Sequence, residues 1–363
     1  MDHTWKQHLY RSIVSLSLTV LFITNANAAN QRIIVHDQAG NVLSSRTNNI
    51  LKNLSYIDSL PFDGITLNIP ATWTLLAPGN VANYNDIYGQ WLAPLKGKLH
   101  KVTHNYVKIV TRLSADPFDD WTRTINNWVV LAEAARDSGL EGIWFDNEEY
   151  FEQMWNYPGD VKYRSKTLSQ YQEQYRLRGH QVMQAIIAKW PAARIVHTHG
   201  PYASMSVTPK SVTMDQISGS NNDLRGYFFA GMLSAAPGLV VDGGEVYQYR
   251  SPSDFANSYN WRKMSMPNLS ADTLIPVSLR GTWMSSDRIA FGTFDQQWRS
   301  SYPMNHYIFQ SCVADALNRT DYIVWTYAES HNYLAPGGVS SDWVNAIWNG
   351  RRAAGVPNPG TTK

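Results

Sequence analysis

The sequence predicts an α/β chain that folds as a single (β/α)8 barrel of the TIM type. Eight apolar runs of strand length alternate with stretches that have helical periodicity. The runs are continuously apolar, which is typical of parallel strands that are buried on both faces. No linker or low-complexity segment interrupts the series, so one domain is expected.

The predicted strands cover 32–36, 64–69, 106–113, 141–149, 194–199, 239–247, 273–283 and 321–328. The predicted helices cover 48–59, 121–138, 168–190, 223–236, 306–318 and 342–352. Pro276 counts against the seventh strand, because proline cannot donate to a sheet ladder. An open doubly wound sheet is the competing architecture. No glycine-rich phosphate turn follows the first run, which disfavours its dinucleotide-binding form.

The two ends of the chain are expected to lie outside the barrel. Residues 1–28 have the features of a cleaved signal peptide: a weakly basic start, a short apolar run over 13–23, and the small residues Ala26-Asn27-Ala28. The run is too short for a stable membrane anchor, so a secreted or periplasmic protein is expected. The barrel then occupies 29–352, and a flexible tail occupies 353–363. The single cysteine, Cys312, allows no internal disulfide.

The net charge and the aromatic content indicate which class of molecule the protein binds. The net charge is +2 and the basic residues are scattered, which argues against nucleic acid. The chain has 14 Trp and 20 Tyr, and such rings offer flat apolar faces with a polar edge for sugar rings. A polysaccharide or oligosaccharide substrate and a monomeric protein are therefore expected. Many of these rings must nevertheless belong to the core.

Gly142 to Tyr150 is the most informative stretch. An apolar run leads into Asp146, Asn147, Glu148 and Glu149. In a strand Asp146 and Glu148 share one face, and two adjacent acids raise the pKa of at least one of them. One carboxyl can then stay protonated as an acid while its neighbour stays charged. The simpler alternative is a solvated acidic loop.

Polar and aromatic residues recur at the ends of the other predicted strands, where barrels gather their functional groups. Two carboxyls with aromatic platforms are the minimum requirement for glycoside hydrolysis. We expect Glu148 to be the acid, Asp146 to assist it, and Glu245 or Glu329 to lie opposite. The substrate-binding candidates are Asn68, Arg112, Asn147, Glu149, His197, His199, Tyr247, Arg280, Trp283, Trp325, Tyr327 and Glu329.

Two other functions remain open. A barrel of this kind could bind carbohydrate without catalysis, if no second carboxyl lies within reach of Glu148. A metal-dependent hydrolase, such as a deacetylase or phosphoesterase, could use His197 and His199 with Asp146 or Glu148. No third His or Cys ligand is evident, so no metal or other cofactor is predicted. Gly243 and Gly244 either form a plain turn or let substrate approach the backbone closely.

The end of the fourth strand resembles two groups of barrel glycoside hydrolases. The family 18 chitinases and the hyaluronidases end this strand in Asp-x-Glu, which is similar to Asp146 and Glu148. That resemblance implies Glu148 as acid, Asp146 orienting a nucleophilic acetamido group of the substrate, and Tyr247 and Trp325 in the site. The clan of cellulases and β-galactosidases ends it in Asn-Glu, like Asn147 and Glu148. That clan also needs a Glu on strand seven, and 273–283 contains none.

Overall fold

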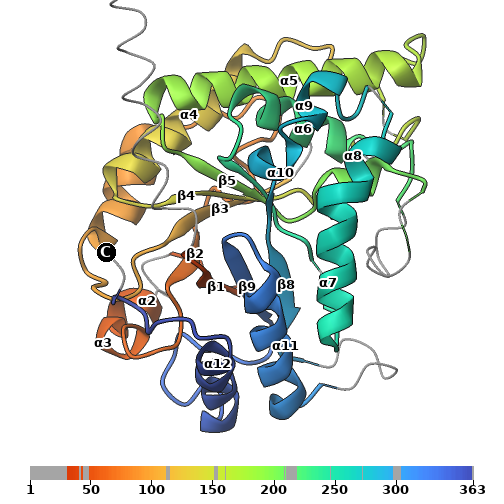
Figure 1. Ribbon diagram of the computed structural model, residues 1–363. Coiled ribbons are helices and arrows are strands. Elements are labelled where there is room, and N and C mark those ends of the chain that lie inside the picture. Colours follow the sequence, from red (N-terminus) through yellow and green to blue (C-terminus); the bar gives the residue numbers. More distant parts are fainter. Residues whose placement is uncertain are drawn as a thin grey trace, which may run out of the picture.

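The computed structural model describes residues 31–361 except 41, 44–48, 112–114, 151–153, 160, 208, 210–218, 246, 272 and 297–303. Within these residues the strands form one parallel sheet in the order β7-β6-β5-β4-β3-β2-β1-β9-β8 (Figure 1). The strands are β1 (Ile33–Gln38), β2 (Gly64–Asn68), β3 (Tyr106–Val110), β4 (Gly142–Asp146), β5 (Arg194–His197), β6 (Val240–Asp242), β7 (Arg288–Ile289), β8 (Phe291–Phe294) and β9 (Ile323–Ala328).

The two edges of this sheet are consecutive pieces of the same chain segment. β7 pairs with β6, and β8 pairs with β9, while only Ala290 separates β7 from β8. The N–H of Ala290 donates to the Asp242 carbonyl and that of Gly292 to the Gly244 carbonyl, both at 2.8 Å. The sheet is therefore a nearly closed parallel barrel, as predicted, and the open doubly wound alternative is wrong.

Helices pack around the outside of the barrel (Figure 1). The longest, α5 (Leu168–Lys189), begins with a capping box in which Thr167 and Gln170 satisfy each other's backbone N–H groups. The other long helices agree with the predicted ranges: α4 (Thr122–Asp137), α6 (Arg225–Ala235), α11 (His306–Arg319) and α12 (Ser341–Ala353). The shorter elements are α2 (Asn49–Lys52), α3 (Leu54–Ile57), η2 (Asn85–Leu92), η3 (Ala93–Leu95), η4 (Pro201–Ser204), α7 (Pro252–Asn260), η5 (Trp261–Ser265), α8 (Met266–Leu269), α9 (Val277–Arg280) and α10 (Trp283–Ser286).

The prediction of a seventh strand over 273–283 is wrong. This segment contains a turn, α9 and α10, and α9 begins immediately after Pro276. A proline fits just before or at the first position of a helix, where no N–H is needed, better than inside a central strand. The seventh barrel strand is instead the segment 288–294, which forms β7 and β8.

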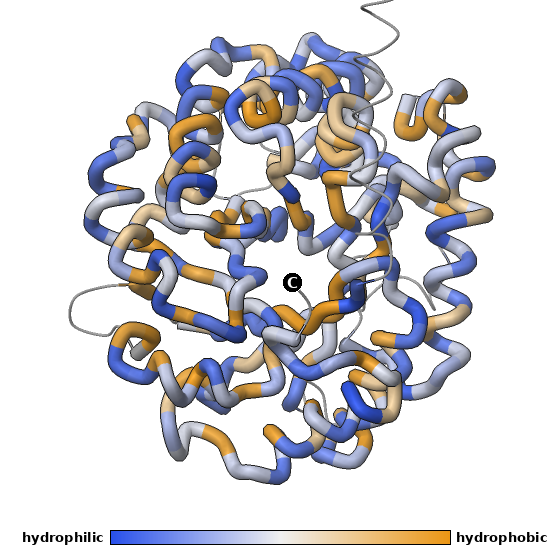
Figure 2. The backbone as a smooth tube through the Cα atoms, turned by 60° about the vertical axis from the view of Figure 1, so that its left-hand side comes forward, coloured by the Kyte–Doolittle hydropathy of each residue, from blue (hydrophilic) through white to orange (hydrophobic). Residues whose placement is uncertain are grey.

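Each strand separates two apolar layers. Inside the barrel, Val35, Tyr106, Trp144, Val196 and Val241 belong to one cluster. Alternate residues such as Ile34, Val107, Ile143 and Ile195 face the helices and form the larger outer core. Polar and apolar residues alternate along the surrounding helices, as expected of helices with one buried face (Figure 2).

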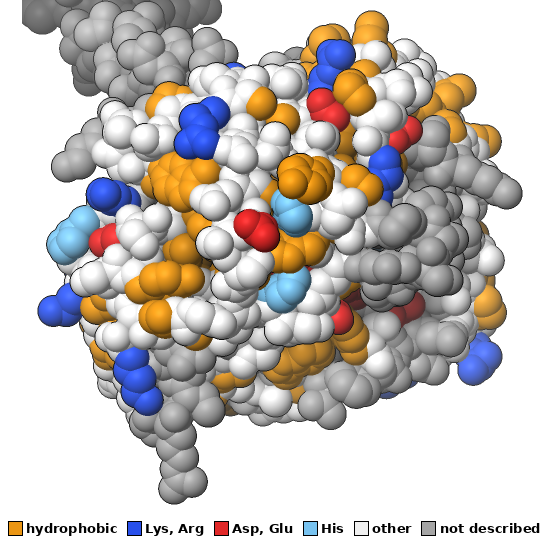
Figure 3. Space-filling model, turned by 90° about the horizontal axis from the view of Figure 1, so that it is seen from below, with side chains coloured by type: hydrophobic (Ala, Val, Ile, Leu, Met, Phe, Trp, Pro, Cys, Tyr) orange, Lys and Arg blue, Asp and Glu red, His pale blue; other side chains and the backbone are white. Residues whose placement is uncertain are grey.

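The predicted signal peptide lies outside the described residues. At the other end, Ala354 and Val356 are buried after α12, so the segment predicted to be a flexible tail begins packed against the body. Among the described residues, no helix is long and apolar enough to cross a membrane. On the face drawn in Figure 3 the Lys and Arg side chains are scattered and do not form one basic patch.

Candidate active site

The fourth strand ends in the two acids on which the site is built. Asp146 is the last residue of β4 and shares the inward face of the strand with Trp144. Glu148 follows beyond the strand end, and both carboxylates line one cavity. The Glu148 N–H donates to Oδ1 of Asp146 at 3.3 Å, which helps to hold this turn. The strand stops three residues earlier than predicted, but the two acids still share a face.

The cavity has a volume of about 160 Å³ and lies at the carboxyl ends of the strands. Aromatic rings form part of its wall. Tyr247 stacks on Tyr327 with ring centroids 5.8 Å apart, and Trp325 meets Tyr247 edge-on at 5.6 Å. A Cβ at Gly292 would come within 2.4 Å of the Trp325 ring, so the ring needs glycine at this position. The full lining is Asp37, Lys108, Asp146, Glu148, Tyr150, Thr198, Glu245, Tyr247, Phe294, Trp325, Tyr327 and Glu329.

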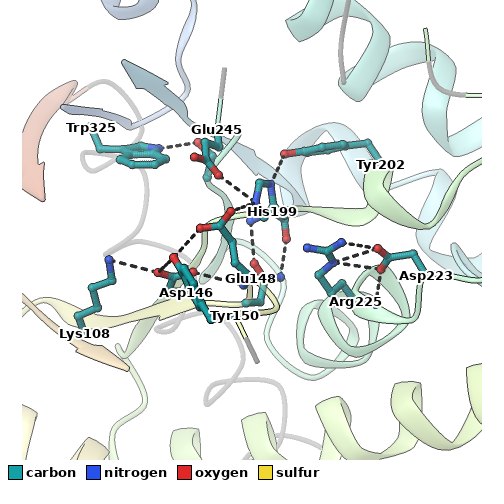
Figure 4. A network of polar contacts seen from close by, with 12 residues as sticks. Lys108, Asp146, Glu148, Tyr150, His199, Tyr202, Asp223, Arg225, Glu245 and Trp325 are labelled. Atoms are coloured by element: carbon teal, nitrogen blue, oxygen red, sulfur yellow. Dashed lines mark hydrogen bonds and ion pairs between the residues drawn. The ribbon is translucent and has the colours of Figure 1, made fainter. Parts of the chain in front are cut away.

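A buried lysine on β3 connects two acids of the cavity. The Lys108 ammonium donates to Asp37 at 2.7 Å. It also lies 3.3 Å from Asp146 (Figure 4). Thr66 donates to the other oxygen of Asp37 at 2.5 Å. Burial lowers the pKa of Lys108, but the charges of Asp37 and Asp146 outweigh burial and raise it above its usual range. Lys108 therefore stays charged and neutralises part of the acidic cluster.

Tyr150 joins the two acids of β4. Its hydroxyl lies 2.7 Å from Oε2 of Glu148 and 3.1 Å from Oδ2 of Asp146. A hydroxyl has one proton, so it donates to one carboxylate at a time. On its outer side the ring packs edge-on against Trp73, with centroids 5.1 Å apart. Tyr150 thus links the acids to the rim of the cavity.

His199 lies between Glu148 and Glu245. Its Nε2 is 2.9 Å from Oε2 of Glu245 and 3.5 Å from Oε1 of Glu148 (Figure 4). The other ring nitrogen is 3.1 Å from the Tyr202 hydroxyl. Asn147 fixes the backbone of His199, because its amide accepts from the His199 N–H at 2.9 Å and donates to the His199 carbonyl at 2.8 Å. The imidazole is therefore oriented from several sides.

Glu245 reaches the cavity because the chain turns at two glycines. Gly244 has φ +57°, and a Cβ there would meet Arg262 and the Ala290 carbonyl. A Cβ at Gly243 would come within 2.3 Å of the His197 carbonyl. Gly243 also accepts a hydrogen bond from the Trp325 indole at 2.8 Å. The glycine pair therefore serves close packing between neighbouring strands.

The pKa values of the two glutamates move in opposite directions. Burial raises the pKa of Glu148, but contacts with His199 and then Tyr150 outweigh burial and lower it to about 2. Burial raises the pKa of Glu245, and the charge of Glu148 adds to this rise although His199 opposes it. One of the two glutamates is thus held charged while the other binds protons more readily.

His199 and Asp146 also have shifted pKa values. Burial lowers the pKa of His199, but Glu148 and Glu245 outweigh burial and raise it to about 9. Burial raises the pKa of Asp146; Lys108 opposes this rise and Glu148 adds to it. At neutral pH His199 is therefore an imidazolium that lies between the charged Glu148 and Glu245.

The structure brings many of the predicted site residues together. Asp146, Glu148, Glu245, Tyr247, Trp325, Tyr327 and Glu329 line the cavity, and His199 and Asn147 lie directly behind it. Asn68 ends β2 at the same end of the barrel but is not part of the lining. Glu149 turns away and accepts a hydrogen bond from the Trp155 N–H at 2.7 Å. Arg112 lies outside the described residues.

Three predicted residues lie elsewhere. His197 faces the helices, where it packs against Phe229 and lies 3.2 Å from the sulfur of Met232. Burial lowers its pKa to about 3, so it is neutral. Trp283 is buried in α10 and donates to the Arg262 carbonyl, and Arg280 in α9 donates to the carbonyls of Ser270 and Ile275. Trp283 and Arg280 do not reach the cavity, because their segment forms α9 and α10 and not the predicted strand.

The sequence prediction does not include Asp37, Lys108, Tyr150, Thr198 and Phe294, which also line the cavity. A signal for Lys108 was present, because a lysine interrupts the apolar run YVKIV at a position whose neighbours are buried. Asp37 likewise follows the first apolar run directly. Phe294 ends β8, which lies outside the predicted seventh strand over 273–283.

Within the part of the chain that the structure describes, Glu148, His199 and Glu245 form a group that could hold a metal ion. One ligand atom from each lies within 4.8 Å of the others, and Glu245 and His199 are buried. The pair His197 and His199 cannot do so together, because His197 faces the outer core. Carboxylate and imidazole ligands suit several divalent ions, zinc among them.

No family model and no curated protein matches this chain. Solved structures resemble it in fold. Active domain 2 of a thermostable chitinase from Pyrococcus furiosus, solved with chito-oligosaccharides, has a TM-score of 0.50 and 8% identity, and covers 91% of this chain and 99% of its own.

Two further structures were found. A GH18 chitinase from Pseudoalteromonas aurantia has a TM-score of 0.44 and 15% identity, and covers 88% of this chain and 99% of its own. A glycoside hydrolase family 5 enzyme from Prevotella bryantii has a TM-score of 0.44 and 12% identity, and covers 89% of this chain and 98% of its own. At such identities the likeness concerns the fold: the chain is similar to barrel glycoside hydrolases over most of its length.

Proposed function

We propose that this protein hydrolyses glycosidic bonds in a polysaccharide or oligosaccharide. The observation that carries the proposal is the convergence of Asp146, Glu148 and Glu245 on one cavity whose wall includes Tyr247 and Trp325. Carboxyls supply the acid and the base or nucleophile of such a reaction, and aromatic faces bind the sugar ring.

Glu148 is the proposed proton donor, with Asp146 assisting. The contact with His199 keeps Glu148 charged, and the proton that Glu148 needs is held on His199, 3.5 Å away. The Glu148 side chain is 22% exposed, so a bound sugar would displace water from it and raise its pKa. The proton can then pass from His199 to Glu148, and from there to the leaving oxygen. Asp146 adjoins Glu148 through Tyr150 and favours the protonated form of the pair.

Glu245 is the proposed second carboxyl. An oxygen of Glu245 lies within 4.8 Å of one of Glu148, and inverting enzymes need a wider separation of about 6.5–9.5 Å to admit a water. We therefore propose that the reaction retains the anomeric configuration. The presence of Glu245 within reach of Glu148 also counts against a barrel that only binds carbohydrate.

The test is the Glu148→Gln variant, assayed for released reducing ends on a panel of amino-sugar polymers, β-glucans, mannans and bacterial exopolysaccharides. Loss of the proton donor is expected to lower the rate by about 10²–10⁴-fold, because glutamine keeps the shape but cannot donate a proton as an acid. Glu173→Gln, on the exposed side of α5, is the matched control and should keep full activity. Unchanged hydrolysis by Glu148→Gln would show that Glu148 is not the acid.

A metal-dependent hydrolase is the second candidate, and the grouping of Glu148, His199 and Glu245 favours it. The protein would then bind about one zinc ion per chain, which calorimetry with zinc alone can measure. Glu245→Gln should weaken that binding, and a chelator should remove hydrolytic activity. A protein that hydrolyses glycans in the presence of excess chelator excludes this candidate.

We also propose that the protein is exported. The basic start, the apolar run over 13–23 and Ala26-Asn27-Ala28 support this proposal. Mass spectrometry of the protein from its native host should find a mature chain that begins near Ala29. An intact chain starting at Met1 would contradict export by cleavage.

A further inference from the structure

A second hollow lies in the segment that follows β2. It is a groove of about 400 Å³ lined by the loop that follows β2 and by the helix η2. Pro70 and Ala71, which follow the end of β2, form one side of it. Because β2 ends at the mouth of the barrel, the groove opens at the same end of the molecule as the cavity. Its size is within the range of small-molecule binding sites.

The lining of this groove has the chemistry of a sugar-binding surface. Trp91 supplies an aromatic face, and Asn83, Asp86 and Gln90 supply amide and carboxylate groups that can bond to hydroxyls. Asp86, Gln90 and Trp91 lie four and five residues apart in η2, which is a π-helix. In a helix with i→i+5 bonds this spacing places them on one face, and π-helical turns are frequently found at functional sites.

Trp73 connects the groove with the cavity. It is 38% exposed and packs edge-on against Tyr150, which lines the cavity and donates to Glu148. The next residue, Thr74, lines the groove. Trp73 therefore contacts the cavity wall at Tyr150, while the residue next to it in the chain lines the groove.

We propose that the groove binds further sugar units of the same chain whose scissile bond lies at Glu148, so that the substrate is a polymer or a long oligosaccharide. This inference rests on the proposed glycosidase function. It predicts that affinity rises with the length of the oligosaccharide, because only a long chain can reach both the cavity and Trp91. A disaccharide occupies only the cavity, so its affinity does not depend on the residues of the groove.

The experiment measures binding in the full-length Glu148→Gln protein, so that ligands are not consumed. Chito-, cello- and manno-oligosaccharides of two to six units are titrated by calorimetry, with and without Trp91→Ala. For the series that binds, the hexasaccharide should bind more tightly than the disaccharide. Trp91→Ala should weaken the hexasaccharide about tenfold, the order expected for loss of one aromatic platform, and leave the disaccharide unchanged.

Two variants keep this test interpretable. Trp91→Phe retains an aromatic face in η2. It should therefore recover most of the hexasaccharide affinity that Trp91→Ala loses. Tyr307→Ala removes an aromatic ring that is 72% exposed on α11 and should change nothing. If the natural protein hydrolyses glycans through Glu148 while Trp91→Ala leaves hexasaccharide binding by the Glu148→Gln protein unchanged, the groove proposal is overturned. The glycosidase function then stands. If no glycan is bound or hydrolysed by the parent, both proposals fall.

Discussion

Asn147 lies between the two acids of β4 in the sequence, but its side chain points to the neighbouring segment. It exchanges two hydrogen bonds with the backbone of His199, as two paired strands would, and it is 1% exposed. Asn147 therefore acts on the site through the position of His199. An amide suits this role, since it offers a donor and an acceptor side by side.

Replacing Asn147 by alanine should lower the free energy of unfolding by about 2–4 kcal/mol, because it leaves a buried N–H and a buried C=O of His199 without partners. Chemical denaturation measures this change. Asn147→Asp is the matched variant: it keeps the acceptor, but its charged form places an oxygen against the His199 carbonyl. Its stability relative to the parent should improve as the pH falls and the aspartate gains a proton that it can donate. A pH-independent difference would contradict this account.

At the scale of an element, α12 is fixed to the barrel by one buried ion pair. Arg351 is 1% exposed and makes two contacts with Asp63, just before β2, one at 2.5 Å and one at 3.1 Å. Asp63 also accepts from the Ile34 N–H at 2.7 Å. The carboxylate thus joins β1, the start of β2 and α12, which brings the last helix against the first strands.

Arg351→Met should therefore destabilise the protein by about 3–5 kcal/mol, since it leaves the buried Asp63 charge unpaired. The neighbouring Arg352→Ala is the control, because Arg352 is exposed and its side chain bonds to Asn349 on its own helix. That control should change the free energy of unfolding by no more than about 0.5 kcal/mol. Adding Asp63→Asn to Arg351→Met should recover part of the loss. Equal effects of the two arginine variants in urea denaturation would refute the anchoring role.

At the scale of the whole molecule, a polar cluster closes the end of the barrel opposite the cavity. Glu141, just before β4, accepts from Tyr322 at 2.6 Å and from Arg194 at 2.8 Å, and lies 2.8 Å from His104. These residues stand at the starts of β3, β4, β5 and β9. The Glu141 carboxylate thus joins the starts of four strands at the end of the barrel opposite the cavity.

This cluster makes stability depend on pH. Burial lowers the pKa of His104, but Glu141 outweighs burial and raises it above its ordinary 6.5. Burial raises the pKa of Glu141, but His104 and then Arg194 outweigh burial and lower it to about 2. The histidine contribution is fully present below pH 6.5 and is lost as the pH rises through the folded pKa of His104. The Glu141 contribution is present above pH 4.5 and is lost as the pH falls toward 2.

The pair should therefore stabilise the fold most between pH 4.5 and 6.5. His104→Gln should lower the free energy of unfolding at pH 5.5 more than at pH 8.5, as measured by denaturation at both values. His100→Gln is a matched control, because His100 is exposed and precedes the same strand, β3. A His104→Gln effect that is equal at the two pH values would rule out protonated His104 as the stabilising form.

The sequence by itself determined the barrel and the position of its acids. Continuous apolar runs with helices between them require a parallel sheet covered on its outer face, and alternation along β4 directs Asp146 inward. Both signals are contained in a single segment of sequence, so they do not depend on which strands pair with one another. The aromatic residues Tyr247, Trp325 and Tyr327 were placed at the site for the same reason.

Only the tertiary structure decided which residues meet at the cavity. His197 and His199 would share a face in a continuing strand, but β5 ends at His197, so the backbone turns and only His199 reaches the glutamates. The seventh strand is recognisable only by its pairing with β6 and β9, whereas in the sequence the apolar segment 273–283 also resembles a strand, although Pro276 counts against it. Lys108 enters the site because two acids from other strands compensate its burial, and that balance depends on distances between segments far apart in the chain.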